Sequence, residues 1–133
     1  MSKLIIVVAV ALIKNKKVLF QERPSEKSMP FLWELPGGKI QIGETPEIAL
    51  IREVNEELGI SINSVDLRSL TFISHSYKDF NLLMPVYLCK KWIGNIFPKE
   101  NQKFKFFNKN ELKKINILEA DLPLIDDLEV HIR

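Results

Sequence analysis

The chain has few of the residues that mark disulfide-stabilised or polyanion-binding proteins. Its 133 residues include one cysteine, Cys89, so an internal disulfide is excluded. Cys89 lies in an apolar stretch, where a buried thiol is the usual interpretation, and this suits a reducing compartment such as the cytoplasm. The 19 basic and 17 acidic side chains leave a net charge of only +2. A nucleic-acid polymer is therefore not expected as a partner, because such partners select a clustered basic face.

The chain also lacks an apolar run long enough to cross a membrane. Residues 4–13 are continuously apolar, but a membrane-spanning helix needs roughly 20 such residues. The run fits a signal peptide poorly, because five apolar residues precede the possible cleavage site at Ala9 and a signal peptide has roughly 7 to 15. Its Ile and Val content instead predicts a strand covered on both faces. With no internal repeat, residues 1–133 predict a single domain without a membrane partner.

Apolar segments between polar turns predict that strands dominate the fold. The expected strands are residues 4–13, 18–21, 65–73, 82–92 and 104–107. Pro85 lies inside the fourth of these and predicts an edge position or a bulge, because proline donates no hydrogen bond to a ladder. Residues 24–30 are polar and bracketed by prolines, which predicts a loop that could border a ligand cleft.

The clearest helix signal follows the glycine-rich segment. Thr45 can cap this helix, Pro46 suits its first position, and Gly59 can end it. A short turn over residues 110–114, capped by its asparagine, and a C-terminal helix over residues 121–130 are also expected. Together these elements predict an α+β layered domain.

Three glutamates gather on one face of the expected helix. At about 100° per residue, Glu53, Glu56 and Glu57 share an arc of about 100°. A separate apolar face that can pack on the sheet consists of Ile51, Val54 and Leu58. Like charges such as Glu53 and Glu57 destabilise a helix by roughly 0.2 to 0.5 kcal/mol per pair, and Mg²⁺ or Mn²⁺ would compensate because hard cations select oxygen ligands. Taken alone, however, three glutamates on a helix more often form a solvated acidic face.

The spacing around the glutamates is more specific than the glutamates themselves. The chain reads Gly38, five residues, Glu44, seven residues, Arg52-Glu53, an aliphatic residue, any residue, Glu56-Glu57, any residue, Gly59 and a second aliphatic residue. With nine defined positions, chance coincidence in a chain of 133 residues is negligible. This pattern resembles the Nudix box with every defined position filled. The apolar N-terminal strand, Arg23, residues 33–40 and residues 120–123 extend the resemblance to the MutT-type branch of the Nudix family.

The resemblance implies a fold and a metal-dependent reaction. The implied fold is a mixed β-sheet sandwiched between helices (α/β/α), with the box as a loop-helix-loop. The implied reaction is hydrolysis of a nucleoside diphosphate linked to another group, assisted by Mg²⁺, with Mn²⁺ as a substitute. Clustered metal ions suit this chemistry because they neutralise phosphoryl charge and activate water. A small-molecule nucleotide is thus the expected partner, and the choice between monomer and homodimer stays open.

The same resemblance implies roles for individual residues. The implied metal ligands are Glu53, Glu56, Glu57 and the backbone carbonyl of Gly37 or Gly38. Arg52 is expected to orient a glutamate through charge-assisted hydrogen bonds, and Glu44 to play a supporting part near the helix start. Glu53 is one candidate for the general base. Glu100, in the loop 98–102, is the other and is expected to approach the metal ions, unless it is a solvated loop glutamate.

The implied substrate cleft lies between the early strands, the middle of the sheet and the start of the last helix. The implied substrate-binding residues are Arg23, Glu34, Leu35, Pro36, Gly37, Gly38, Phe80 and Asp121. Asp121 stands where MutT itself carries asparagine; an ionised aspartate only accepts hydrogen bonds, so it could take two N–H donors of a guanine or merely cap the last helix. Phe80 stands where MutT has a basic residue, which puts that contact in doubt. Arg23 is otherwise an exposed arginine at a strand end.

Further residues could complete the cleft. An apolar wall against the base is expected from Leu4, Ile6, Val8 and Leu82, although each is more often plain core. Tyr77 lies at a distance from the box that recurs in the dinucleoside-polyphosphate branch. Otherwise His75 and Tyr77 form a half-exposed strand pair.

The favoured function is a Mg²⁺-dependent nucleoside triphosphate pyrophosphohydrolase that releases the monophosphate and pyrophosphate, with 8-oxo-dGTP as substrate and nucleotide-pool sanitising as its purpose. One alternative is another nucleotide, such as CTP or a dinucleoside polyphosphate. A second is a Nudix module that binds nucleotides without cleaving them. Such modules usually lose glutamates from the box, whereas this chain keeps all of them together with Arg52, which disfavours binding alone.

Overall fold

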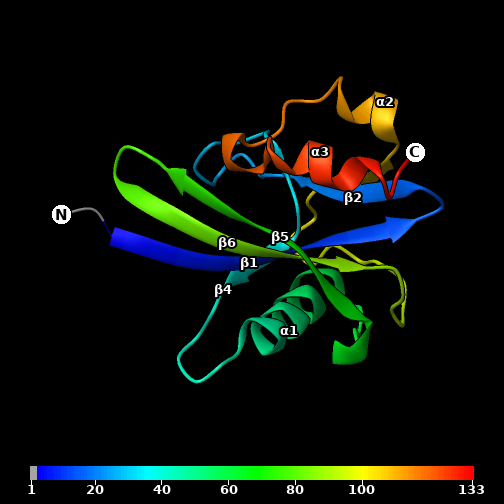
Figure 1. The fold of residues 1–133 in the computed structure, drawn as a ribbon, viewed down its shortest axis with the longest axis horizontal. Coiled ribbons are helices and arrows are strands. Elements are labelled where there is room, and N and C mark those ends of the chain that lie inside the picture. Colours follow the sequence, from blue (N-terminus) through cyan, green and yellow to red (C-terminus); the bar gives the residue numbers. More distant parts are fainter. Residues whose placement is uncertain (1–2) are drawn as a thin grey trace.

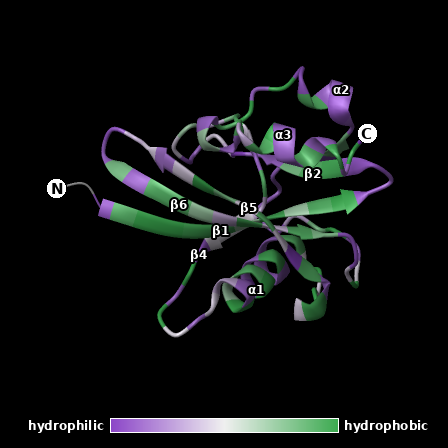
Figure 2. Ribbon diagram, viewed as in Figure 1, coloured by the Kyte–Doolittle hydropathy of each residue, from purple (hydrophilic) through white to green (hydrophobic). Residues whose placement is uncertain are grey.

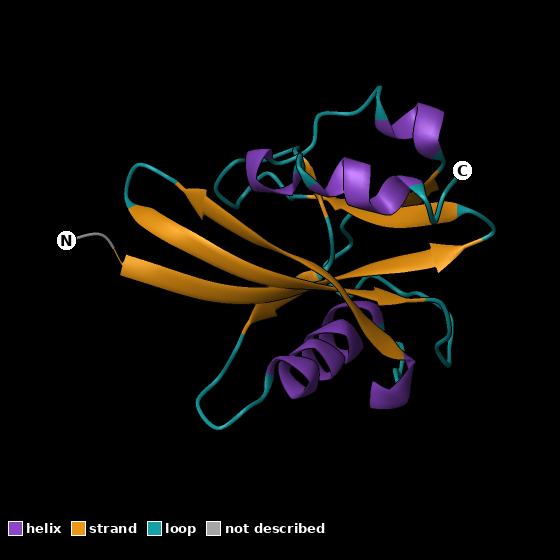
Figure 3. Ribbon diagram, in the orientation of Figure 1, coloured by secondary structure: helices purple, strands orange, loops and turns teal. Residues whose placement is uncertain are grey.

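The computed structural model describes residues 3–133, in which a mixed β-sheet lies between layers of helices (Figure 1, Figure 3). The strands are β1 (Lys3–Lys14), β2 (Lys17–Glu22), β3 (Trp33–Glu34), β4 (Gly37–Lys39), β5 (Leu67–Ser76), β6 (Phe80–Cys89) and β7 (Phe104–Phe107). The helices are α1 (Pro46–Leu58), α2 (Lys109–Leu112) and α3 (Leu124–Glu129), with the 3₁₀ turns η1 (Ser64–Asp66) and η2 (Glu119–Asp121). Because α1 lies on one side of the sheet and α2 and α3 on the other, the expected α/β/α sandwich is confirmed.

The sheet is built around β1. This strand pairs in parallel with β6, and β6 pairs with β5 in the antiparallel sense. Residues 7–9 of β1 also pair with β4, and its last two residues pair with β2. In turn, β2 pairs with β3 and β7. β1 therefore joins two parts of the sheet, and β4 brings the glycine pair at residues 37–38 to its centre.

Alternate residues of β1 enter separate cores on the two faces of the sheet. The core on the α1 side contains Val8, Val10 and Leu12 of β1 with Ala49, Leu50, Val54 and Leu58 of α1. The core on the other side contains Ala9, Ala11 and Ile13 of β1 with Leu124 and Leu128 of α3. A strand with both faces covered needs a continuous apolar run, which appears as the green central part of β1 in Figure 2. The prediction for the first strand is thus confirmed for residues 8–13.

α1 begins and ends where the sequence predicts. The Thr45 hydroxyl accepts a hydrogen bond from the Ile48 amide at 3.2 Å, and Pro46 is the first helical residue. Gly59 ends the helix at a φ of 70°, a left-handed conformation that glycine adopts without steric cost. Val54 and Leu58 are fully buried against the sheet, and Ile51 is partly buried beside them. The predicted apolar face is confirmed, and the glutamates are left beside the core.

Three local predictions are wrong. Pro85 does not lie at an edge, because β6 runs between β1 and β5. It does not lie in a bulge of β6 either: the register shift falls in β5, between Ser69 and Thr71, while the parallel pairing with β1 skips residues 84 and 85. Asn108 rather than Asn110 caps α2, because Asn108 and Glu111 form a reciprocal capping box. The helix predicted over residues 121–130 is shorter, because Asp121 ends the 3₁₀ turn η2 and α3 spans Leu124–Glu129.

Two further details concern the end of one strand and the length of the helices. The fourth predicted strand stops at Cys89 instead of continuing to Trp92. Among the helices of residues 3–133, none is both long and apolar enough to span a bilayer.

Candidate active site

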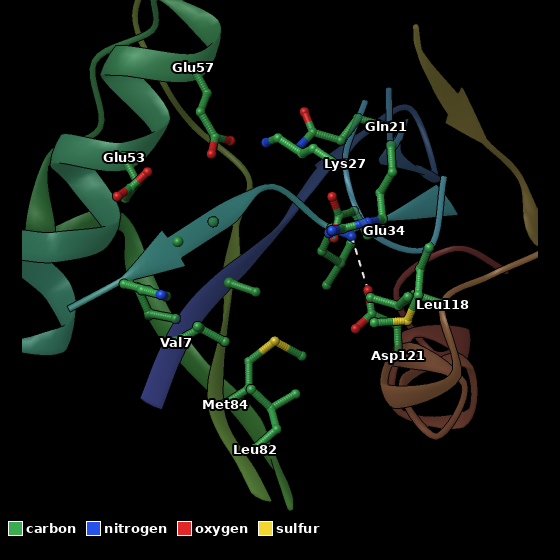
Figure 4. Close-up of a pocket in the computed structure, with 18 of the residues that line it drawn as sticks. Val7, Gln21, Lys27, Glu34, Glu53, Glu57, Leu82, Met84, Leu118 and Asp121 are labelled. Atoms are coloured by element: carbon green, nitrogen blue, oxygen red, sulfur yellow. Dashed lines mark hydrogen bonds and ion pairs between the residues drawn. The ribbon is translucent and has the colours of Figure 1, made fainter. Parts of the chain in front are cut away.

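Of the three box glutamates of α1, two point into a cleft and the third lies at its edge, largely exposed. Glu53 and Glu57 point from α1 into the cleft (Figure 4). Glu56 is 60% exposed and turns toward Arg52, with 3.3 Å between its Oε2 and Nη1 of the arginine. Within residues 3–133, no three His, Cys, Asp or Glu side chains are grouped closely enough to hold a metal ion by themselves. The glutamates converge in a pair, and a third protein ligand has to come from elsewhere or from rotation of Glu56.

Arg52 ties the glutamate helix to the loop that precedes it. Its Nε and Nη2 donate to the two carboxylate oxygens of Glu44 at 2.7 and 2.9 Å. Its Nη1 donates to Glu53 at 3.0 Å, and Nη2 also reaches the Lys39 carbonyl at 3.2 Å. The hydrogen bond from Arg52, supported by one from the Gln41 amide, lowers the pKa of Glu44 to about 2. Glu44 is therefore ionised at any ordinary pH, and Arg52 is held in one orientation behind Glu53.

The two glycines of β4 allow a very close approach. A Cβ atom on Gly37 would lie 2.0 Å from the Val8 carbonyl oxygen, and one on Gly38 would lie 2.3 Å from the carboxyl carbon of Glu53. At residue 37 the contact is with backbone, so only glycine lets this segment run against β1, whereas a side chain at residue 38 would have to displace the Glu53 carboxyl group. The backbone of Gly38 consequently lies directly against the Glu53 carboxylate.

Glu57 carries a buried oxygen atom that has no partner. Among the described residues, no group makes a hydrogen bond to its Oε2. Burial, followed by the negative charge of Glu53, raises the pKa of Glu57 to about 8. A buried carboxylate oxygen without a donor is costly, and a cation shared with Glu53 would remove that cost. Carboxylate and backbone carbonyl oxygens are the ligands that Mg²⁺ and Mn²⁺ select, so the residues present fit such an ion.

A cleft of about 720 Å³ extends from the glutamates across the sheet toward η2. This volume lies within the range of roughly 300 to 1,000 Å³ that is usual for small-molecule sites. The expected site residues that line it are Arg23, Glu34, Leu35, Gly37, Gly38, Glu53, Glu56, Glu57, Phe80, Glu100 and Asp121. Figure 4 shows Glu53 and Glu57 on one side of the cleft and Asp121 on the other. The fold thus brings segments from the whole length of the chain to one site.

The side of the cleft opposite α1 holds two carboxyl groups in a buried setting. Asp121 is 3% exposed, and its Oδ2 accepts a hydrogen bond from the Leu35 amide at 3.1 Å. Burial raises the pKa of Asp121 to about 7, against the opposing effect of that bond. Burial also raises the pKa of Glu34, although Arg23 pairs with it at 2.9 Å. Asp121 does not cap the last helix, because α3 has no side-chain cap.

Aromatic rings form another part of the lining. Tyr77 and Phe80 stack with ring centroids 4.9 Å apart and an angle of 28° between their planes, and both line the cleft. His75 packs edge-on against Tyr77 at 4.6 Å. A flat aromatic surface of this kind suits the face of a heterocyclic base. From sequence alone, Tyr77 carries a weak marker of the dinucleoside-polyphosphate branch, and the contact expected at Phe80 is in doubt.

Several expected residues lie outside the cleft. Arg52 does not line the cleft and contacts the glutamates from outside it. Pro36 does not line it either, and its carbonyl accepts a hydrogen bond from the Val10 amide at 3.0 Å. The expectation that Leu4 and Ile6 face the base is wrong, since they are 62% and 42% exposed and do not line the cleft. Ile5, Val7 and Ala9 of β1 line it, because successive side chains of a strand point to opposite faces. Val8 and Leu82, the other two residues of the expected apolar wall, do line the cleft.

Sequence reasoning also missed residues that line the cleft. Among them are Gln21, Lys27, Met84 and Leu118. Gln21 and Met84 lie within apolar segments and carry no signal of their own. Lys27 belongs to the proline-bracketed loop, whose predicted position beside a ligand cleft was the available signal.

Comparison with known proteins defines the family. A family model described as the NUDIX domain matches residues 3–128. The chain belongs to the Nudix family. An 8-oxo-dGTP diphosphatase of Escherichia coli is 30% identical over 129 residues, which cover 97% of this chain and 98% of that protein. A CTP pyrophosphohydrolase of Escherichia coli is 28% identical over 126 residues, covering 93% and 90% of the two chains.

A solved structure supports the fold of this Nudix protein. The structure of a MutT NUDIX hydrolase from Burkholderia pseudomallei superposes with a TM-score of 0.85, at 22% identity, over 95% of this chain and 98% of that one. The predicted resemblance to MutT-type Nudix hydrolases is confirmed, as is the prediction of a hydrolase. Nudix hydrolases act on small nucleotide substrates and generally use divalent metal ions.

Proposed function

We propose that the protein is a Mg²⁺-dependent nucleoside triphosphate pyrophosphohydrolase that converts 8-oxo-dGTP to the monophosphate and pyrophosphate. The observation that carries this proposal is the single cleft that joins the glutamate pair of α1 to the buried carboxyl group of Asp121. A nucleotide has the matching division, with a heterocyclic base at one end and a phosphate chain at the other. The names of the relatives add support, because one of them is an 8-oxo-dGTP diphosphatase. We place the enzyme in the cytoplasm, where its buried free thiol Cys89 would stay reduced.

The glutamate end is proposed to hold the metal. Glu53, Glu57 and a backbone carbonyl of the Gly37–Gly38 segment would bind Mg²⁺, with Glu56 joining after rotation away from Arg52 and Glu100 approaching from the loop 98–102. When bound, Mg²⁺ neutralises charge on the phosphoryl oxygens and lowers the pKa of water. Mn²⁺ has the same preference for oxygen ligands and is the expected substitute.

The protein's own contribution to the reaction is orientation and proton transfer. Hydrolysis adds water across one phosphoric anhydride bond, so a base has to accept a proton from the attacking water. Glu53 is our candidate, because Arg52 and the Gly38 backbone hold its carboxylate at the mouth of the cleft. Glu100 is the second candidate; it lines the same cleft but is more than half exposed and has a looser environment. Arg52, itself fixed by Glu44, acts as a positioning residue.

The base end is proposed to select a purine. One oxygen of Asp121 accepts from the Leu35 amide, which leaves the second free to meet a hydrogen-bond donor of the base. Guanine presents two adjacent N–H donors on its Watson–Crick edge, whereas cytosine presents one amino group. Tyr77 and Phe80 would support the face of the ring, and Arg23 would meet a carbonyl or phosphate oxygen.

A pyrimidine substrate is the second candidate, since one relative is a CTP pyrophosphohydrolase. The two functions separate in a panel of nucleotides incubated with Mg²⁺, with phosphate products followed by chromatography. We expect 8-oxo-dGTP to give the highest kcat/KM and pyrophosphate to be released. Equal rates on dGTP, dCTP and 8-oxo-dGTP would refute the sanitising role, and a preference for CTP would select the second candidate. No turnover of any nucleoside diphosphate derivative would refute hydrolysis altogether.

A further inference from the structure

Lys27 occupies a position that neither the Nudix box nor the flanking motifs account for. It lies in the loop between β2 and β3 and lines the cleft together with the glutamates of α1. Figure 4 shows its side chain extending from this loop toward Glu57. Its positive charge also lies near enough to Glu34 to act on that carboxyl group. Lys27 therefore stands between the glutamate end and the base end of the cleft.

The loop holds Lys27 in place through its neighbours. The Lys27 amide donates to the Pro24 carbonyl at 3.2 Å, which closes a turn. The next residue, Ser28, is fixed by Arg23, whose Nε donates to the Ser28 carbonyl at 2.7 Å and whose Nη2 reaches the Ser28 hydroxyl at 3.2 Å. The Phe31 amide returns to the Arg23 carbonyl at 2.9 Å. The backbone that carries Lys27 is thus anchored at several points, although its side chain is half-exposed.

The only ion pair of Lys27 within residues 3–133 is a weak one. Its Nζ lies 3.6 Å from Oε2 of Glu100, and both side chains are about half exposed. Such exposed pairs contribute roughly 0 to 1 kcal/mol, so a better anion can displace the carboxylate at little cost. Glu100 belongs to the loop 98–102 between β6 and β7, so the contact joins two loops that both line the cleft.

The cationic side chains of the cleft differ in how free they are to bind such an anion. Six carboxyl groups and four cationic side chains line it. Among the cations, Arg23 has its donors directed to Glu34 and to Ser28. Lys39 lies on the strand at the glutamate end, and Lys99 lies over the end of α1 near Gly59. Lys27 is the cation placed where a phosphate chain must cross from the base end to the glutamates.

We propose that Lys27 binds the phosphate chain of the substrate and exchanges its contact with Glu100 for one with a phosphate oxygen. This inference rests on the proposed function, since it assigns a further substrate-binding residue to the same cleft. A lysine ammonium suits the role because it is a flexible point charge that can follow a phosphate group. The exchange also frees the Glu100 carboxylate at the moment when substrate arrives.

The test uses inorganic triphosphate with Mg²⁺ as the probe, because this ligand carries the phosphate chain and no base. Its Kd is measured by calorimetry for the wild type and for Lys27→Ala, Lys27→Arg and the control Lys114→Ala, whose side chain is exposed outside the cleft. We expect Lys27→Ala to weaken binding at least fivefold, Lys27→Arg to restore most of it, and Lys114→Ala to leave it unchanged. An unchanged Tm in all variants separates lost binding from lost folding.

Each outcome decides the inference. A loss below fivefold in Lys27→Ala, an equal loss in Lys114→Ala, or no binding of inorganic triphosphate by the wild type would overturn the role of Lys27. The proposed function is judged separately, by turnover in the nucleotide panel. A wild type that binds inorganic triphosphate through Lys27 yet hydrolyses no nucleotide would support the phosphate site and refute the enzyme.

Discussion

Replacing Asp121 with asparagine should remove a pH-dependent cost from the folded protein. Asp121 is 3% exposed and has one hydrogen-bond donor, the Leu35 amide. Burial is the main reason that its pKa rises from 3.8 to about 7, and the charge of Glu34 adds to the effect. Asparagine has nearly the same shape and an oxygen that can accept from the same amide, but it carries no charge at any pH.

The sign and size of the effect follow from linkage. Because the pKa of Asp121 is higher in the folded than in the unfolded state, the folded protein binds the proton more tightly. The corresponding stability is fully present below pH 3.8, falls as the pH rises through the window between 3.8 and about 7, and is lost above it. A shift of about three pKa units at about 1.36 kcal/mol per unit gives a loss of about 4 kcal/mol. Asp121→Asn should lack this loss, so its stability relative to the wild type should grow between pH 4 and pH 8.

The assay is urea unfolding of both proteins at intervals across this pH range. Glu57 also has a raised pKa and gives a slope of the same sign, but it is common to both proteins and cancels in the difference. Glu34 interacts with Asp121, so the difference reports the two carboxyl groups together. Asp126→Asn is the matched control, because it makes the same substitution at an exposed residue of α3. A difference for Asp121→Asn that changes by less than about 0.5 kcal/mol over the whole range would refute the argument.

Two substitutions at the glutamate end test the proposed roles. Glu53→Gln should leave the fold intact and reduce kcat at least about a hundredfold, because it removes a base or an essential ligand; a loss below tenfold in steady-state assays would contradict either role. Gly38→Ala should displace the Glu53 carboxyl group, which lies 2.3 Å from the new Cβ, and should reduce kcat while circular dichroism shows an intact fold. Full activity in Gly38→Ala would show that the close approach is unnecessary.

The parts of this protein that were predictable from sequence are encoded by local spacing. The start and end of α1 follow from Thr45, Pro46 and Gly59, whose effects act within one helical turn. The shared face of the glutamates follows from the helical period alone. The box also sets the number of residues between Gly38, Glu44 and Arg52, which decides how the preceding segment lies against the helix. The structure realises this register through the Arg52 hydrogen bonds and the contact between Gly38 and Glu53.

The errors arise where long-range pairing decides the result. The strand that contains Leu4 and Ile6 is predicted correctly, but the face on which they lie is not. In an entirely apolar strand, the sequence does not indicate whether the odd-numbered or the even-numbered residues face the cleft. Pro85 predicts an edge position or a bulge, yet it lies in the central strand β6, where the pairing with β1 skips residues 84 and 85. An exposed loop lysine such as Lys27 has no sequence signature of its own. Its position in the cleft, beside Glu100 and near Glu57, is what indicates a role.

The base end of the cleft depends on contacts that no local pattern can encode. Leu35 and Asp121 are separated by 86 residues, and the hydrogen bond between them joins the strand segment before the box to the turn before α3. Tyr77 and Phe80 come from yet another part of the chain, since Tyr77 follows β5 and Phe80 begins β6. The box residues of the glutamate end, by contrast, lie within β4, α1 and the loop between them. We therefore expect substitutions at residues 77, 80 and 121 to alter the preference for the base while the contacts of Arg52, Gly38 and Glu53 stay intact.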